Sequence, residues 1–127
     1  MDSRGGLSLS NITNNLEAIV KSEITQLHKI HFGKGPVKTT VKIFDNIVFV
    51  RFDDGLTQVE QSLMDTAEGE ELVRKIRDEM IMKRTPLYVP RVEELVKEKL
   101  DGVCYMLDKK NKAVLMFLAF ENEIVLY

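Results

Sequence analysis

The chain lacks most of the features that define specialised protein classes. A single cysteine, Cys104, excludes an internal disulfide. The net charge is only −2, with both signs interspersed. This argues against a dedicated nucleic-acid binder, because such proteins neutralise phosphates with clustered lysine and arginine. The longest apolar run, Ala113–Phe120, is too short to cross a bilayer as a helix. Residues 1–10 lack the apolar core of a secretory signal. We therefore expect a cytoplasmic protein without a transmembrane segment.

The remaining composition is that of an ordinary soluble domain. Of the 127 residues, 44% are apolar and 30% are charged. A chain of this length fits one domain better than two and can bury a core without disulfides or metals. We expect a flexible N-terminal tail at residues 1–8 and a single α+β domain at residues 9–127.

The first third of the chain predicts one long helix that ends at a glycine turn. Apolar residues recur at three- and four-residue spacing up to Ile30, which is typical of a helix of about six turns. Ser10 is the expected N-cap. Gly33 is the expected stop of the helix, and Pro36 forbids its continuation.

Two strands and a helical region follow the turn. Residues 37–43 alternate between apolar and polar, as a half-buried strand does, whereas residues 47–52 are apolar at nearly every position, so we expect both faces of that strand to be covered. Thr57 and Glu60 form a capping box that opens a short helix. We expect a break near Gly69, and then a helix over residues 70–84 whose inner face carries Leu72, Val73, Ile76 and Met80.

The prolines of the sequence predict a further interruption. Pro86 and Pro90 should end the second helix of this region and begin a third, which Gly102 should end. A hairpin then closes the chain, with strands over residues 103–107 and 113–120. The element order is α-β-β-α-α-α-β-β, which favours an α+β fold with a four-stranded, mainly antiparallel sheet and helices packed on the sheet.

No set of residues adds up to a catalytic site. His28 and His31 share a helix face but lack a third metal ligand nearby in the sequence. Cys104 lies in an apolar strand and is expected to be an inert, buried thiol. We therefore predict no catalytic residue, no metal, no cofactor and no enzymatic activity.

Two binding hypotheses remain. The turn at Gly33, Lys34 and Gly35, together with Lys38, offers amides and amines for an anion or a nucleotide phosphate. It lies at a helix C-terminus, where the dipole disfavours anions, and a purely structural turn is the competing interpretation.

The second hypothesis is an interface between copies of the chain. The strands at residues 47–52 and 113–120 carry apolar residues on both faces, and an uncovered apolar surface usually marks an interaction site. Either helices cover both faces of a monomer, or the chain forms a homodimer. We favour the homodimer, with the candidate interface residues Phe49, Met116, Leu118 and Phe120.

Several short motifs together resemble the MpsC family, named for a component of a Na⁺-translocating membrane potential-generating system. The resemblance covers most of the chain, roughly from Leu9 to the C-terminus. Its carriers are Phe32-Gly33-Lys34-Gly35-Pro36, Leu56-Thr57 with Glu60 and Leu63, Gly69 with Leu72-Val73 and Arg77, and Val92-Glu93 leading to Gly102-Val103.

The resemblance implies a cytoplasmic bacterial protein that acts beside a membrane transport system for cations or inorganic carbon. It carries over no catalytic residue. Pro86 and Pro90 depart from the continuous helix that the family commonly shows. The leading hypothesis is therefore a non-enzymatic, dimeric accessory protein, and the alternative is the anion-binding module.

Overall fold

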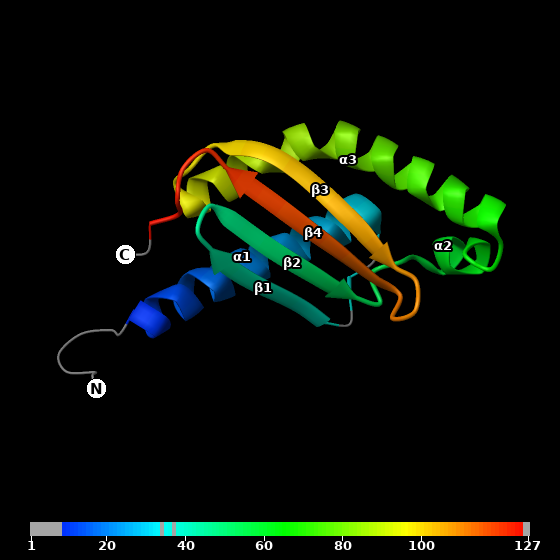
Figure 1. Ribbon diagram of the computed structural model, residues 1–127, viewed down its shortest axis with the longest axis horizontal. Helices are drawn as coiled ribbons and strands as arrows, with labels where there is room; N and C mark the ends of the chain where they lie inside the picture. The colour runs from blue at the N-terminus through cyan, green and yellow to red at the C-terminus, as the bar shows by residue number, and fades with distance from the viewer. Residues whose placement is uncertain (1–8, 34, 37, 126–127) are drawn as a thin grey trace.

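The computed structural model describes residues 9–33, 35–36 and 38–125. The tail expected at residues 1–8 and Lys34 lie outside these residues. The described chain confirms the α+β fold (Figure 1). Its elements in chain order are α1 (Leu9–Phe32), β1 (Lys38–Phe44), β2 (Ile47–Asp53), α2 (Gln58–Leu63), α3 (Ala67–Val96), β3 (Leu100–Asp108) and β4 (Ala113–Phe120).

The four strands form one antiparallel sheet in the order β1-β2-β4-β3. The two central strands, β2 and β4, are those that are apolar at nearly every position. The edge strands β1 and β3 carry more polar residues, because one side of an edge strand faces solvent. Both predicted hairpins, β1–β2 and β3–β4, are confirmed by the pairing.

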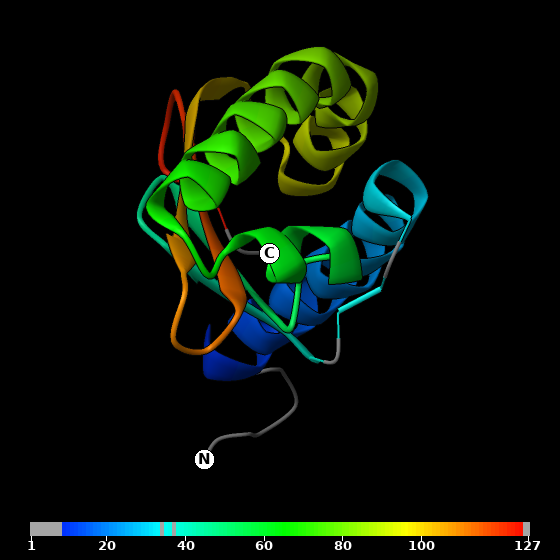
Figure 2. The same cartoon turned by 90° about the vertical axis from the view of Figure 1, so that its right-hand side faces the viewer.

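All three helices lie on the same face of the sheet, and the other face is open (Figures 1 and 2). Alternate strand residues point under the helices, and Val48, Val50 and Phe52 of β2 are almost completely buried there. The intervening residues of β2 are only half-buried. The expectation that both faces of residues 47–52 are covered is therefore wrong.

Helix α1 ends as the sequence predicts but begins earlier. Gly33 has a φ of +75°, and its N–H donates to the carbonyl of Lys29 at 3.0 Å, which is the usual left-handed termination of a helix. Ser10 lies inside the helix rather than at its cap, because the helix already begins at Leu9. Val20, Ile24 and His28 are buried on the side of α1 that faces the core.

Helix α3 is a single element of 30 residues that contains both Pro86 and Pro90, so the predicted division into two helices is wrong. Each proline leaves the carbonyl four residues earlier without its helical donor. Pro86, Pro90 and Met82 are exposed, so water can satisfy the freed carbonyls. The helix curves along its length (Figure 2), as proline-containing helices commonly do.

The C-terminal end of α3 also differs from the prediction. The helix ends at Val96, and Lys97 adopts the left-handed conformation with a φ of +61°. Gly102 lies in β3, beside an irregularity in the pairing with β4. A non-glycine residue thus provides the left-handed stop, which residue type alone does not reveal.

Candidate functional site

The open face of the sheet carries a continuous apolar centre. Phe49 of β2 and Phe117 of β4 are register partners, and their ring centroids lie 5.1 Å apart. Around them lie further apolar residues of the same face: Phe44, Ile47, Cys104, Met106, Leu115 and Ala119. Phe44 is 50% exposed and Met106 is 57% exposed. We call these eight residues the open-face patch.

The open face combines an apolar centre with charged residues. Strands of seven residues in a four-stranded sheet span roughly 23 Å by 19 Å, an area of about 400 Å². Contiguous apolar residues on such an area usually mark a binding surface in a monomer. Charged residues of both signs, Lys42, Arg51, Asp53 and Asp108, surround the centre, as the polar rim of an interface does.

The four predicted interface residues do not lie on the same face of the sheet. Phe49 lies on the open face, whereas Leu118 and Phe120 are buried under the helices at 4% and 1% exposure. Met116 shares their face and lines an internal cavity. Side chains alternate between the two faces along a strand, so Met116, Leu118 and Phe120 of β4 all lie on the covered face. Leu115 and Phe117 are the β4 residues on the open face.

Cys104 is exposed, so the expectation of a buried thiol is wrong. It is the register partner of Phe117 and lies on the open face. The sequence indicated a buried thiol because the strand is apolar, but Cys104 lies on the face of the sheet that no helix covers.

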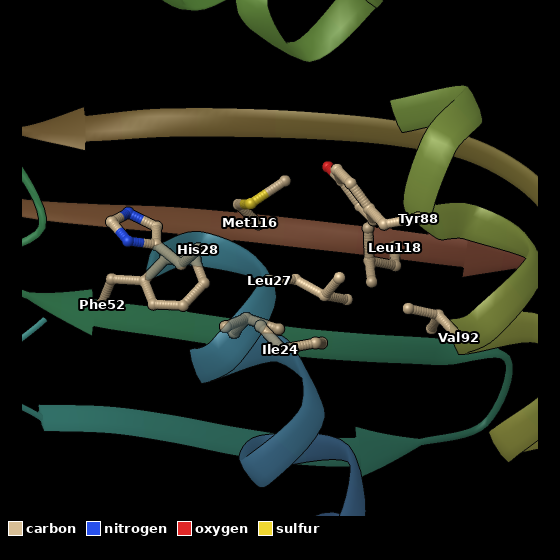
Figure 3. Close-up of a pocket in the computed structure, with 9 residues that line it drawn as sticks. Ile24, Leu27, His28, Phe52, Tyr88, Val92, Met116 and Leu118 are labelled. Carbon is tan, nitrogen blue, oxygen red and sulfur yellow. The ribbon is translucent and has the colours of Figure 1, made fainter. Parts of the chain in front are cut away.

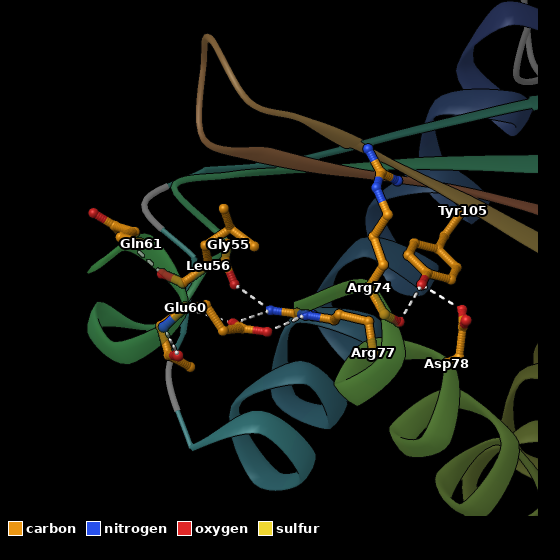
Figure 4. A network of polar contacts seen from close by, with 9 residues as sticks. Gly55, Leu56, Glu60, Gln61, Arg74, Arg77, Asp78 and Tyr105 are labelled. Carbon is orange, nitrogen blue, oxygen red and sulfur yellow. Dashed lines mark hydrogen bonds and ion pairs between the residues drawn. The ribbon is translucent and has the colours of Figure 1, made fainter. Parts of the chain in front are cut away.

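A buried ion pair joins α2 to α3 (Figure 4). Arg77 donates to the two carboxylate oxygens of Glu60, each at 2.7 Å, and to the carbonyl of Gly55 at 3.0 Å. Arg77 is 1% exposed and Glu60 is 6% exposed. The sequence predicted the capping box of Glu60, which the structure confirms, but not this ion pair. The signal in the sequence was the spacing: Arg77 comes four residues after the core residue Val73, so the two share a helix face.

The electrostatic balance at Glu60 favours its charged form. Burial on its own raises the pKa of the Glu60 carboxyl, but the hydrogen bonds and charge of Arg77 outweigh burial and, with the hydrogen bonds of Thr57, hold that pKa below its ordinary value. Thr57 N–H donates to Glu60 at 2.8 Å. One carboxylate therefore closes both a helix cap and an interhelical ion pair, and this fixes α2 against α3.

A second polar contact joins α3 to the sheet. The hydroxyl of Tyr105, on β3, lies 2.5 Å from a carboxylate oxygen of Asp78 and 3.1 Å from the carbonyl of Arg74, as Figure 4 shows. Burial and then the neighbouring Asp78 raise the pKa of the Tyr105 phenol. The phenol is thus held neutral as a hydrogen-bond donor.

Replacing Tyr105 with phenylalanine is expected to change how stability depends on alkaline pH. Because the pKa of Tyr105 is raised in the folded state, its contribution is complete below the ordinary phenol pKa of about 10 and is lost as pH rises above it. Wild-type stability should therefore fall above about pH 10, and the Tyr105→Phe variant should fall less steeply. Thermal unfolding across this range measures both slopes, and equal slopes would contradict the contact.

A small apolar cavity lies between α1, α3 and the covered face of the sheet (Figure 3). Its volume is ≈ 30 Å³, about the space of a single water molecule. The lining residues are Ile24, Leu27, His28, Val50, Phe52, Tyr88, Val92, Met116 and Leu118. The Tyr88 hydroxyl lies 3.3 Å from that of Thr85. This volume is well below the roughly 300–1,000 Å³ of the pockets that usually hold small-molecule ligands.

The two histidines of α1 contact aromatic rings. The ring of His28 lies 4.4 Å from that of Phe52, and the ring of His31 lies 5.5 Å from that of Tyr88. Within the described ranges, no three histidine, cysteine, aspartate or glutamate residues are grouped so that they could hold a metal ion.

The predicted anion site is described only in part. Gly33 ends α1, and Lys38 is the exposed first residue of β1, while Lys34 is not among the described residues. The alternation of β1 places Lys38 and Lys42 on the same side of the strand. Binding of an anion at Gly33, Lys34, Gly35 and Lys38 stays a prediction.

The comparisons with known proteins identify a family. The model of the family described as "Na+-translocating membrane potential-generating system (MpsC)" matches residues 13–122. No curated protein and no solved structure matches the chain. Among the helices that the structure describes, none has the length and apolar character needed to span a membrane.

Proposed function

The chain belongs to the MpsC family, and on this premise we propose that it is a non-enzymatic, dimeric accessory protein of a Na⁺-translocating membrane potential-generating system. We propose a cytoplasmic location for it. The observation that carries the proposal is the open-face patch, centred on Phe49 and Phe117. A side of the sheet that the chain's own helices leave uncovered is suited to contact another protein.

A second copy of the chain fits the open face. The face carries the positive residues Lys38, Lys42 and Arg51 and the negative residues Asp53 and Asp108, and Arg51 and Asp53 form an ion pair with each other within the chain. In a two-fold dimer the same surface meets itself, so a face with both signs can set the cations of one copy against the carboxylates of the other. Packing of two such sheets would bury the aromatic centre between them.

The non-enzymatic part of the proposal is supported by the character of the interior. The cavity beneath the helices is lined mainly by apolar side chains, with His28 and Tyr88 among them, and its volume of ≈ 30 Å³ is far below that of the pockets that usually hold small molecules. The buried charges Glu60 and Arg77 are bonded to each other.

Replacing Phe49 with aspartate is expected to convert the dimer to a monomer, because the variant would bury an unpaired carboxylate at the centre of the interface. Light scattering at micromolar concentration measures the mass, and circular dichroism checks the fold. The control is Val59→Asp, which makes the same chemical change at a residue of α2 that is 69% exposed and lies away from the open face. A monomeric wild type, or a Phe49→Asp variant that stays dimeric, would reject the open-face dimer.

A further inference from the structure

The residues of the open face form rows across the four strands. The register places Lys42, Phe49, Phe117 and Cys104 level with one another on β1, β2, β4 and β3. This row therefore runs from a lysine at one edge of the sheet, through two aromatic rings, to a small side chain at the other edge. Because the two halves of the row differ, the contacts with a second copy depend on how that copy is turned.

The charges of the open face are divided unequally between its two edges. Lys38 and Lys42 lie on β1, and Asp108 lies on β3. Within the described residues, none of these three forms an ion pair. Arg51 and Asp53 of β2, by contrast, are bonded to each other at 2.8 Å. The β1 edge thus carries unpaired positive charge, and the β3 edge carries unpaired negative charge.

Lys38 and Asp108 stand at the two ends of one row. Lys38 is level with Asp53, and Asp108 is level with Ala113. One further step along the antiparallel ladder of β2 and β4 brings Asp53 level with Ala113. Hydrogen bonds from Asn111 are the largest cause that lowers the pKa of Asp108, so its carboxylate is charged at neutral pH.

Two sheets that pack face to face with aligned strands can be related by a two-fold axis in either of two directions. If the axis runs across the strands, each β1 lies over the β1 of the other copy. Lys38 and Lys42 of both copies then gather at one edge, with no carboxylate on either β1 strand, and like charges so opposed are destabilising. If the axis runs along the strands, β1 of each copy lies over β3 of the other, which sets Lys38 opposite Asp108.

The sizes of the side chains favour the same direction. An axis along the strands, between β2 and β4, places each row over the same row of the other copy in reverse order. Phe49 then faces Phe117 of the other copy, so that four rings meet at the centre in contacts that aromatic pairs favour. Ile47, the register partner of Ala119, faces Ala119 of the other copy. A large side chain thus meets a small one, as close packing requires.

We infer that two copies pack their open faces about a two-fold axis that runs along the strands, with Lys38 of each copy paired to Asp108 of the other. The inference rests on the proposed dimer, and it specifies how the copies are arranged and which charges select a second copy of this chain as the partner. The aromatic centre supplies the apolar contact, and the two symmetry-related ion pairs fix the orientation.

Two charge-reversed chains test the pairing. Lys38→Glu and Asp108→Lys should each dimerise about tenfold more weakly than the wild type, because like charges then face each other. An equimolar mixture of the two should form mainly the heterodimer, in which both ion pairs return with their signs exchanged. Native mass spectrometry, with a tag on one chain, measures the three species, and circular dichroism checks the fold.

The matched control mixes Lys75→Glu with Asp108→Lys. Lys75 is an exposed residue of α3, on the opposite side of the sheet from the open face. The two chains of this mixture have the same net charges as the test pair, but their heterodimer gains no matching ion pair. It should therefore form no excess of heterodimer, which separates the specific pair from a general attraction of charge.

Cys104 provides an independent measure of the direction of the axis. In the inferred arrangement Lys42 lies opposite Cys104 of the other copy, so Lys42→Cys should give a covalent dimer with a short bismaleimide. Lys42→Cys/Cys104→Ser should still dimerise but give no covalent dimer. Its two introduced thiols would lie at opposite edges, separated by three strand spacings, or at least about 14 Å.

The outcomes separate this inference from the proposed function. No excess of heterodimer over the control mixture, or a covalent dimer of Lys42→Cys/Cys104→Ser, would overturn the inferred arrangement. Either result, with a wild-type dimer that Phe49→Asp disrupts, rejects the direction of the axis and leaves the open-face dimer in place. A monomeric wild type rejects the open-face dimer itself, and the arrangement with it.

Discussion

Replacement of Arg77 by methionine is expected to lower the free energy of unfolding by about 3–5 kcal/mol. The variant keeps the volume of the side chain but leaves the carboxylate of Glu60 buried without its partner, and it removes the bond to the Gly55 carbonyl. An uncompensated buried charge costs far more than the pair itself contributes. Urea unfolding followed by circular dichroism measures the loss.

The double variant Glu60→Leu/Arg77→Met distinguishes a lost ion pair from lost packing. Removing both charges removes the cost of burying them, so this variant should recover much of the stability that Arg77→Met loses. It should still be less stable than the wild type by about 2–4 kcal/mol at most, because the Glu60 half of the capping box on Thr57 and the hydrogen bond from Arg77 to the Gly55 carbonyl are both lost. Equal destabilisation of the single and double variants would show that packing, and not charge, is responsible.

Acidic pH provides a second check on Arg77→Met. In the wild type the pKa of Glu60 is lowered, so its contribution is present above the ordinary carboxyl pKa and is lost as pH falls through the lowered value. In the variant, burial without Arg77 should raise this pKa, so protonation relieves the buried charge. The stability difference between the two proteins should therefore shrink from pH 7 to about pH 4.5. A constant difference would contradict this electrostatic account.

Replacement of Gly69 by alanine is expected to destabilise the fold by about 3 kcal/mol. Helix propensity alone predicts the opposite sign, because alanine is favoured over glycine in a helix by about 1 kcal/mol. In the structure, a Cβ at Gly69 would lie 1.8 Å from the carbonyl oxygen of Leu63 and 3.0 Å from the Thr66 hydroxyl. The backbone between α2 and α3 would have to move.

The matched control is Gly102→Ala in β3, where an added Cβ meets no atom within 4 Å. Its effect should stay within about 0.5 kcal/mol. Chemical unfolding of both variants at the same pH tests the contrast. A Gly69→Ala variant as stable as the wild type would show that the approach of α2 to α3 is looser than the structure indicates.

Gly69 also illustrates how local patterns mislead. The sequence predicted a break near this glycine and an inner face that includes Leu72 and Ile76. The break exists but lies at residues 64–66, and Thr66 caps a helix that runs through Gly69. Leu72 and Ile76 are 47% and 41% exposed. The contact of Gly69 with α2 and the ion pair of Arg77 rotate α3, so that Gly69, Val73 and Arg77 face inwards. Hydrophobic periodicity cannot anticipate an arginine and a glycine as core contacts.

The candidate site on the sheet could be predicted only in part. The two-sided apolar pattern of residues 47–52 and 113–120 correctly indicated more apolar strand surface than a one-sided sheet needs. Which face remains open depends on where α1 and α3 pack. The sequence therefore could not show that Leu118 and Phe120 lie on the covered face. Lys21 of α1 lines the same groove as Lys38 and Lys42 of β1, and no spacing in the sequence encodes this proximity.

The sequence by itself determined the features that depend on neighbours along the chain: the stop of α1 at Gly33, the capping box of Thr57 and Glu60, and the alternation of β1. Each follows from backbone conformation or hydrogen bonds within a few residues. Only the tertiary structure decided the rotation and continuity of α3, the open face of the sheet and the exposure of Cys104. These depend on contacts between distant segments, where a buried ion pair and a close helix approach outweigh local propensity.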